Sequence, residues 1–387
     1  MSRISTSSHP RNEKNGSARD RPFVCILSVS PADSGASRSA RERFQKFVGA
    51  LSTAGLAAQH CEVSDIAGME ETLLLLAPDL VFSVPDHLPL STAEAGSSLR
   101  GGTGGRTANV HSVLESMEIP YIGSSPDTID LVLSKADLKD RWLAFGVATP
   151  PFVRLAEGEG MKALEGRKLP AFPIIVKPAR EGNSRGIFDD SVVFDIESLA
   201  SAVERIAGSH GELIAEQYVG ISSDFREFTV SMMGSGEAMV VMPAELVFAQ
   251  PKRLRVITNE DKEESRTRAI PITDGFLHAA VVSFAKRAFR VAGVRDYARC
   301  DMALACGNLT AIEVNGQPMV PDSWFESCAK HRGLDENQYL AAIAFAAMER
   351  HRAEGISRRP VPHEMERVLP SWLYAALRRQ PAEKGGA

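Results

Sequence analysis

The sequence predicts an α/β (α+β) protein with three subdomains, of which the first is a small doubly wound domain. Up to about residue 130, short apolar runs alternate with helical stripes, which is typical of a parallel sheet covered by helices. Further on, a buried strand leads into a basic loop that contains glycine, and a Gly-Asn turn joins two later strands. At about 150 residues per domain, a chain of 387 residues allows two or three domains.

The expected divisions follow these patterns. Residues 1–21 are rich in Ser, Arg and Asn and contain no apolar stretch, so they are expected to be a disordered tail and not a secretory signal. An N-terminal α/β domain at 22–132 precedes a central subdomain at 133–220 and a C-terminal subdomain at 221–355. A second tail at 356–387 is rich in Pro and Arg, with one short helix over Ser371–Leu377.

Composition argues against several classes of protein. Hydrophobic residues make up 44% and charged residues 24% of the chain, which is ordinary for a globular protein. A formal charge of −5 gives no general attraction to nucleic acid or to an anionic membrane. No apolar run approaches the ~18 residues of a membrane span. The five cysteines are scattered without zinc-ligand spacing, so reduced thiols and a cytoplasmic location are expected.

The N-terminal domain is expected to begin with a buried strand over Phe23–Val29, followed by a loop over Ser30–Ser39 that is rich in Gly, Ser and Pro. A helix with apolar residues at i, i+3, i+4 and i+7 then ends at Gly55. A strand over Leu80–Val84, a second helix and a short apolar run at Ile119–Gly123 complete the alternation. The apolar stripes are Phe44, Phe47, Val48 and Leu51, and then Val110, Val113, Leu114 and Met117.

The stretch Phe172–Ile187 reads F-P-I-I-V-K-P-A-R-E-G-N-S-R-G-I. Its apolar part predicts a buried strand ending at Lys177, and a loop with two glycines, a serine and two arginines follows. Glycines let backbone N–H groups approach an anion, and the cations balance the charge of that anion. The residues alone leave two interpretations equally open, a phosphate-binding loop and a basic surface turn. The residue order of a Walker loop is absent.

A second candidate site lies on the predicted hairpin, where Y-A-R-C-D-M-A-L and L-T-A-I-E-V-N flank the Gly-Asn turn. Residues two apart share a face of a strand, so Arg299 and Asp301 point the same way, as do Glu313 and Asn315. Two adjacent carboxylates repel each other unless a cation lies between them, and oxygen ligands of this kind suit Mg²⁺. The alternative is a polar face turned to solvent, which is the commoner arrangement.

Taken together, these motifs resemble the ATP-grasp enzymes, and most closely the D-alanine–D-alanine ligase branch with its patterns V-K-P-x-R-E-G-S-S-x-G, R-x-D and E-x-N. The matches run in order from about Gly104 to Phe325. The resemblance implies an ATP-grasp fold, with a pre-ATP-grasp domain first, a central subdomain that covers the nucleotide and a C-terminal subdomain with the metal site. It also implies ATP and two Mg²⁺ ions, with Mn²⁺ as the alternative metal.

The resemblance assigns roles residue by residue. Lys135, Lys177 and the glycine-containing loop would hold phosphates, the segment from Glu216 to Val219 would bind adenine, and Glu227 would bind the ribose. A further phosphate contact would come from Lys252 or Lys262, both without an aromatic partner, and Lys262 is preferred. The nucleotide residues are then Lys135, Lys177, Glu181, Gly182, Ser184, Glu216, Gln217, Tyr218, Val219, Glu227 and Lys262. The metal ligands would be Asp301, Glu313 and Asn315, and the catalytic residues Arg299, Ser184 and the backbone N–H of Gly316.

The positions that would face the substrates depart from the family pattern. The Gly-Glu-Asp-Gly loop reads Gly105–Ala108 here, with arginine in place of the acid. The N-terminal glutamate that anchors the first substrate's ammonium is missing, and a segment containing an arginine stands there. These changes favour a first substrate that is acidic or lacks a free α-amine. The candidate substrate residues are Arg38, Arg106, Met319, which replaces a glycine, and Ser323, which keeps a hydroxyl.

The expected function is therefore an ATP-dependent carboxylate–amine ligase that forms an amide through an acyl phosphate. Its partners would be small-molecule carboxylate and amine substrates other than D-alanine, as in specialised metabolism. One alternative is a true D-alanine–D-alanine ligase of peptidoglycan synthesis, and another is a catalytically silent ATP-binding partner protein. Neither nucleic acid nor a membrane is an expected partner, and the resemblance makes a homodimer a possible assembly.

Overall fold

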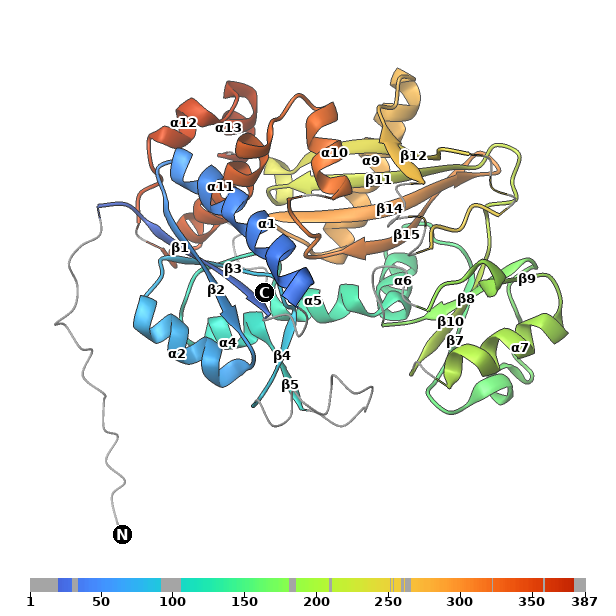
Figure 1. Cartoon of the computed structure of the whole chain (residues 1–387). Helices are drawn as coiled ribbons and strands as arrows, with labels where there is room; N and C mark the ends of the chain where they lie inside the picture. Colours follow the sequence, from blue (N-terminus) through green and yellow to red (C-terminus); the bar gives the residue numbers. More distant parts are fainter. Residues whose placement is uncertain are drawn as a thin grey trace, which may run out of the picture.

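The described residues of the computed structural model form three larger sheets and one two-stranded sheet, β4-β5, and Figure 1 shows how the three larger sheets are arranged. A four-stranded sheet lies at the blue N-terminal end. A second four-stranded sheet is green, and a five-stranded sheet runs from yellow to orange. The structure describes residues 20–29, 34–91, 106–180, 186–208, 211–250, 252, 254–258, 261, 266–321, 323–357 and 359–378. No helix within these ranges is long and apolar enough to cross a membrane.

The N-terminal sheet is parallel, with the strand order β2-β1-β3-β6. The predicted strands and helices are present, but the predicted loop over Ser30–Ser39 is wrong from Ser34 on, where α1 begins. The apolar stripe of α1 packs on the sheet, and this packing extends the helix into residues of weak intrinsic propensity. The elements are β1 (Phe23–Val29), α1 (Ser34–Thr53), β2 (Ala57–Val63), α2 (Ile66–Leu76), β3 (Leu80–Ser83), the hairpin β4 (His87–Pro89) and β5 (Thr107–Asn109), α4 (Val110–Ser116) and β6 (Tyr121–Ile122).

The central sheet is antiparallel and has a hydrophobic core of its own. Its order is β7-β10-β8-β9, and α7 packs Leu199, Val203 and Ile206, which recur at helical spacing, against it. The elements are β7 (Phe152–Leu155), the 3₁₀ turn η1 (Gly160–Leu164), β8 (Ile174–Pro178), η2 (Asp189–Ser191), β9 (Val192–Val193), α7 (Ile196–Ala207) and β10 (Leu213–Gln217).

The C-terminal sheet has the order β13-β12-β11-β14-β15 and is antiparallel throughout. Side chains alternate between its faces, so Met232 packs with α6 and α9 while Met233 packs with α10 and α11. The elements are α5 (Pro126–Leu133), α6 (Lys135–Ala144), β11 (Arg226–Met233), η3 (Gly236–Ala238), β12 (Val240–Phe248), β13 (Thr267–Ile270), α9 (Gly275–Ala292), β14 (Tyr297–Ala305), β15 (Asn308–Asn315) and α10 (Trp324–His331).

The last helices complete the core between the first and third sheets. They are α11 (Glu336–Ala353), α12 (Glu364–Val368) and α13 (Ser371–Leu377), and α11 lies beside α1 in Figure 1. The predicted short helix over Ser371–Leu377 is confirmed. A second helix in this segment, α12, was not predicted, and the described residues continue to residue 378. The apolar residues of this segment recur every four positions and are buried, namely Met365, Leu369, Leu373 and Leu377.

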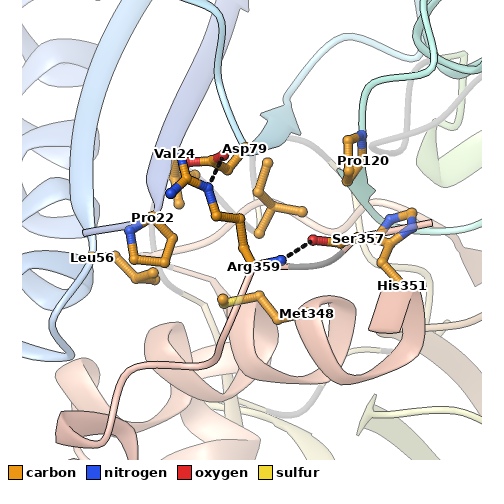
Figure 2. A pocket seen from close by; sticks show the side chains of 10 residues that line it. Pro22, Val24, Leu56, Asp79, Pro120, Met348, His351, Ser357 and Arg359 are labelled. Atoms are coloured by element: carbon orange, nitrogen blue, oxygen red, sulfur yellow. Dashed lines mark hydrogen bonds and ion pairs between the residues drawn. The ribbon is translucent and has the colours of Figure 1, made fainter. Parts of the chain in front are cut away.

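One contact that ties this last segment to the N-terminal sheet is shown in Figure 2. Arg359 Nε donates to Asp79 Oδ1 at 2.7 Å, and Asp79 Oδ2 accepts from the backbone N of Phe23 at 2.8 Å. The cavity beside this contact has a volume of about 10 Å³ and is lined by residues such as Leu56 and Met348. That is room for about one water molecule, so the feature is a packing joint and not a ligand site.

A buried ion pair joins Asp296, the residue before β14, to α11 and β6. Arg350 donates through Nε and Nη2 to the two carboxylate oxygens of Asp296, both at 2.8 Å, and Nη2 also donates to Tyr121 O at 3.0 Å. The backbone N of Gly123 donates to Asp296 Oδ2 at 2.8 Å. Burial alone would raise the pKa of Asp296, but Arg350 holds it below its ordinary value. The N-terminal and C-terminal sheets are therefore fixed to each other by charge as well as by packing.

Replacing Asp296 with alanine should lower the free energy of unfolding by about 3–5 kcal/mol, because Arg350 would be buried without its counter-charge. Urea denaturation followed by tryptophan fluorescence measures the change. The matched control is Arg352→Ala, which removes a 2.8 Å pair with Glu349 at the surface of the same helix and should change stability by less than about 1 kcal/mol. A loss for Asp296→Ala no larger than that of the control would contradict this role.

Candidate active site

Strands β14 and β15 bring four polar side chains together near one end of their hairpin. Arg299 lies opposite Asn315 and Asp301 opposite Glu313, with an irregularity in the register directly after Asp301. The Arg299 guanidinium donates to both carboxylate oxygens of Asp301 at 3.2 Å, and Thr229 Oγ1 donates to Asp301 Oδ1 at 3.0 Å. Burial lowers the pKa of Arg299, but Asp301 and Glu313 raise it above its ordinary value. The structure thus places these residues as the alternation of the strands predicts.

Lys135 connects this hairpin to the central sheet. It is the first residue of α6, and its backbone N donates to Ala179 O, just beyond β8, at 2.9 Å. Its Nζ lies 3.5 Å from Glu313 Oε2, and the side chain is only 7% exposed. A lysine that would be solvated on most helices is therefore held inside the molecule beside a carboxylate.

A buried carboxylate joins α6 to the central sheet a second time. Glu216 on β10 has Lys177 Nζ at 3.2 Å from its Oε1 and Lys139 Nζ at 2.7 Å from its Oε2. Lys139 Nζ also donates to Thr149 Oγ1 at 2.6 Å. Burial alone would raise the pKa of Glu216, but Lys139 and Lys177 hold it below its ordinary value. Burial lowers the pKa of Lys139 to about 8, so this lysine is mostly charged at neutral pH.

The chain leaves β10 through Gln217, Tyr218 and Val219. The backbone N of Tyr218 donates to Pro173 O at 2.8 Å, which holds this linker against the start of β8. The Tyr218 hydroxyl is buried without a hydrogen-bond partner among the described residues. Burial, with a contribution from nearby Glu227, raises the pKa of Tyr218 to about 12. The Tyr218 ring belongs to an apolar cluster with Val192, Val256, Ile175, Ile187 and Leu254.

The oxygen atoms of Asp301, Glu313 and Asn315 fit a hard divalent cation. No group of three or more His, Cys, Asp or Glu residues within the described ranges could hold a metal, so any ion here needs further ligands. Mg²⁺ commonly takes one or two carboxylates and completes its shell with water and substrate phosphates. The two carboxylates already attract cations, since Arg299 and Lys135 lie beside them. The donor set therefore fits Mg²⁺ when a polyphosphate supplies the remaining oxygens.

The segment after Asn315 is packed tightly beneath α5. A Cβ at Gly316 would lie 2.9 Å from Val132 Cγ2, so glycine allows the close approach. The backbone N of Gln317 donates to Asn315 Oδ1 at 3.0 Å, and its side-chain Nε2 lies 2.7 Å from His111 Nε2. The His111 ring contacts a backbone carbonyl at 2.7 Å through Nδ1, and burial lowers its pKa to about 4. The neutral ring therefore donates through Nδ1 and accepts the Gln317 amide hydrogen through Nε2.

The predicted substrate residues lie around this segment. Met319 is 40% exposed. Ser323 Oγ accepts from the backbone N of Phe325 at 3.2 Å and donates to Met319 O at 2.5 Å, so its hydroxyl caps α10. Arg106 is exposed beside β5, whereas Arg38 lies on α1 with a side chain outside the described residues. The role of these residues toward a substrate stays a prediction.

Several predicted nucleotide residues cannot be placed. Glu181, Gly182, Ser184 and Lys262 lie outside the described residues. The alternative lysine, Lys252, donates to Asp261 Oδ2 at 2.7 Å and to Val256 O at 2.9 Å. Its Nζ lies 5.8 Å from the ring centroid of Phe248. The prediction that Lys252 has no aromatic neighbour is therefore wrong, because β12 extends to Phe248 and brings the ring beside the loop.

Comparison with known proteins identifies the family. A family model described as "D-ala D-ala ligase C-terminus" matches residues 142–344, which is more than half of the chain. The chain belongs to the D-alanine–D-alanine ligase family. It is 32% identical over 238 residues to the D-alanine–D-alanine ligase of Xanthomonas axonopodis pv. citri (strain 306), covering 60% of this chain and 70% of that one. It is 28% identical over 248 residues to the D-alanine–D-alanine ligase of Cupriavidus metallidurans, covering 64% and 73%.

Solved structures show the same fold. The D-alanine–D-alanine ligase of Bacillus anthracis complexed with ATP has a TM-score of 0.61 at 18% identity, covering 86% of this chain and all of that one. The VanG D-Ala:D-Ser ligase of Enterococcus faecalis has a TM-score of 0.59 at 16% identity, covering 84% and 99%. The expected ATP-grasp fold is confirmed. This D-alanine–D-alanine ligase family member is an ATP-dependent enzyme that forms C–N bonds, as predicted.

Two contacts of this ligase were not predicted. One is Lys139, which follows Lys135 by four residues and therefore shares its face of α6, a spacing that could have indicated a second buried cation. The other is the contact between Gln317 and His111, which are 206 residues apart and whose proximity depends on the tertiary fold.

Replacing Gly316 with alanine should destabilise the ligase by about 1–3 kcal/mol and lower its activity, because the new methyl group would press on Val132 and move the chain beside Asn315. Thermal unfolding and ATP turnover measure the two effects. The double variant Gly316→Ala with Val132→Ala is the control, since it removes the contacting methyl groups and should recover much of the activity. Wild-type activity in the single variant would show that the close approach is unimportant.

Proposed function

We propose that this ligase joins an amine to a carboxylic acid other than D-alanine, and that the acid carries a second acidic group or lacks a free α-amine. The proposal rests on a difference between two sets of residues in the site: the nucleotide residues follow the family pattern and the substrate residues depart from it. On the nucleotide side, Lys135 and Lys177 keep the lysines of the family pattern and are held in place by carboxylates, Glu313 and Glu216. On the substrate side, Arg106 and Met319 stand where the family pattern has an acid and a glycine. Nucleotide chemistry is retained while substrate contacts have changed.

ATP is proposed to lie between the central and C-terminal sheets. Adenine would contact Glu216 and the linker that begins at Gln217, with the apolar cluster around Tyr218 covering one of its faces. Glu227, which lies close enough to Tyr218 to affect its pKa, would accept from the ribose hydroxyls. Lys177 would reach the phosphates from the end of β8. A ligase of the same fold, that of Bacillus anthracis, was solved as a complex with ATP, which supports ATP as the nucleotide.

Asp301, Glu313 and Asn315 would hold Mg²⁺, which when bound neutralises charge on the phosphates. Lys135 adds a positive charge at the same end of the hairpin. The Arg299 guanidinium would face the transferred phosphoryl group and, together with the backbone N–H of Gly316, the oxygen of the acyl group. Catalysis then consists mainly of positioning and charge stabilisation.

The proposed reaction has two steps. A carboxylate oxygen of the acid attacks the γ-phosphorus of ATP, the bond to the bridging oxygen breaks, and ADP leaves. The amine nitrogen then attacks the acyl carbon, loses a proton and displaces phosphate, which leaves an amide. Ser184, in the loop after Lys177, would help to exclude water from the acyl phosphate. Because the reaction consumes ATP, we infer a cytoplasmic location. A homodimer is the assembly that the family resemblance implies.

The second candidate function is D-alanine–D-alanine ligation itself. It is favoured by the names of the relatives, which are 28–32% identical to this chain over about two thirds of its length. A silent ATP-binding role is the third candidate, and the assembled pairs of Arg299 with Asp301 and Lys135 with Glu313 argue against it. The two experiments below separate these candidates.

Replacing Asp301 with asparagine should lower turnover by about 10²–10³-fold, because the proposed Mg²⁺ site would lose an anionic ligand and with it charge stabilisation at the phosphates. Mg²⁺-dependent ADP release, with hydroxylamine present to trap the acyl phosphate, measures turnover. The matched control is Asp224→Asn, which alters a carboxylate that accepts from Cys306 N and Gly307 N at the far turn of the same hairpin. Unchanged turnover in Asp301→Asn would contradict the proposed metal site.

Hydroxamate formation across a panel of acids should identify the first substrate. The panel contains D-alanine, other D- and L-amino acids, dicarboxylates and N-blocked acids, and the signal is expected from the last two groups. Arg106→Glu should raise the KM of that acid by about tenfold, equivalent to about 1.4 kcal/mol, with little change in kcat. The control is Arg367→Glu, at an exposed position on α12. A signal from D-alanine alone would instead establish the second candidate function.

A further inference from the structure

We propose that Lys139 is a positioning residue of the ATP site: as the permanent counter-ion of Glu216, it allows Lys177 to leave that carboxylate for the phosphates of ATP. The inference rests on the proposed function, in which Glu216 faces adenine and Lys177 faces the phosphates. Lys139 itself touches neither, because its side chain is completely buried behind Glu216.

The two lysines are held differently. Lys139 Nζ lies 2.7 Å from Glu216 Oε2 and donates to Thr149 Oγ1 at 2.6 Å, and that hydroxyl donates in turn to Ala311 O on β15 at 2.8 Å. It is thus fixed from two sides and cannot leave without breaking both contacts. Lys177 Nζ has one polar partner within the described residues, Glu216 Oε1, at the longer distance of 3.2 Å. Lys177 is the lysine that can exchange partners.

Electrostatics explains why two lysines are needed. If Lys177 were the only counter-ion, its movement to a phosphate would leave the buried Glu216 carboxylate unpaired, which is strongly unfavourable. The carboxylate would therefore retain Lys177 and weaken its contact with phosphate. With Lys139 in place, Glu216 stays charged and paired when Lys177 moves. It can then accept a hydrogen bond from the amino group of adenine through the oxygen that Lys177 has left.

The position of Lys139 on α6 supports the same conclusion. Lys135 and Lys139 are one turn apart, and they pair with carboxylates on different sheets, Glu313 on β15 and Glu216 on β10. The helix is anchored to the C-terminal part of the molecule, where Trp142 Nε1 donates to Ala288 O at 3.1 Å. A counter-ion on this helix therefore remains in place whatever Lys177 does on β8.

Binding of nucleotides to the full chain tests the proposal without knowledge of the acid or amine. Lys139→Met should raise the Kd of a non-hydrolysable ATP analogue with Mg²⁺ by about tenfold or more, since tenfold corresponds to about 1.4 kcal/mol. The Kd of adenosine, measured by competition, should change far less, because adenosine has no phosphate for Lys177. The double variant Lys139→Met with Glu216→Gln should bind the ATP analogue more tightly than Lys139→Met alone, because a neutral amide no longer retains Lys177. Glu216→Gln alone supplies the reference for loss of the carboxylate.

If Lys139 only stabilised the fold, its replacement would weaken the binding of both ligands alike. Equal weakening of adenosine and the ATP analogue, or a double variant that binds no better than Lys139→Met, would overturn the proposal. If Lys139→Met does not fold, Thr149→Val loosens the same lysine while keeping its charge, and the same comparison of the two ligands decides. Wild-type protein that fails to bind the ATP analogue would overturn the proposed function as well, whereas normal wild-type binding with the structural pattern overturns only the role of Lys139.

Discussion

The pairing of one buried carboxylate with two lysines determines how the nucleotide side of this ligase is built. Glu216 comes from the central sheet and Lys139 from a helix that packs on the C-terminal sheet, so the ion pair spans the two parts of the ATP-grasp fold. An unpaired charge inside a protein is unfavourable by several kcal/mol, so these groups have to meet when the chain folds. The same helix repeats the arrangement with Lys135 and Glu313. The proposed ATP site is thus the place where charges from different sheets neutralise one another.

The proposed substrate side uses other residues than the proposed nucleotide side. Gln317, in the segment after the hairpin, contacts His111 at the start of α4, so this region combines residues from the N-terminal and C-terminal parts. None of these contacts involves Lys139, Lys177 or Glu216. Because the two sides share few residues, substitutions can change the acid that is accepted without disturbing the nucleotide. In the proposed function, this separation would allow the acid to differ while the nucleotide stays the same.

The residues that could be predicted from the sequence are those whose position follows from local periodicity. Arg299 and Asp301 follow from alternation along β14, and the buried stripe of α7 follows from helical spacing. The start of α1 at Ser34 could not be predicted, because packing on the sheet outweighs the weak propensity of its first turn. The charge pairing of Lys139 depends on β10 lying beside α6, which only the tertiary fold determines. In the C-terminal segment, Pro370 interrupts the four-residue spacing of the buried apolar residues. Because proline is typical of a helix boundary, the sequence does not predict one continuous pattern.

The division of the hydrophobic core has a consequence for motion. One cluster of described residues includes Phe82 from the N-terminal sheet and Tyr297 from the C-terminal sheet, whereas the cluster of the central sheet contains only residues between 153 and 215. Sliding the N-terminal and C-terminal sheets past each other would expose apolar surface, so we expect these two sheets to move together. The central sheet shares a smaller apolar cluster with the rest of the molecule, the one around Tyr218, so we expect any tilting to involve this sheet. For the proposed ligase, such a tilt would change the space between the central and C-terminal sheets, which is where the nucleotide is proposed to lie.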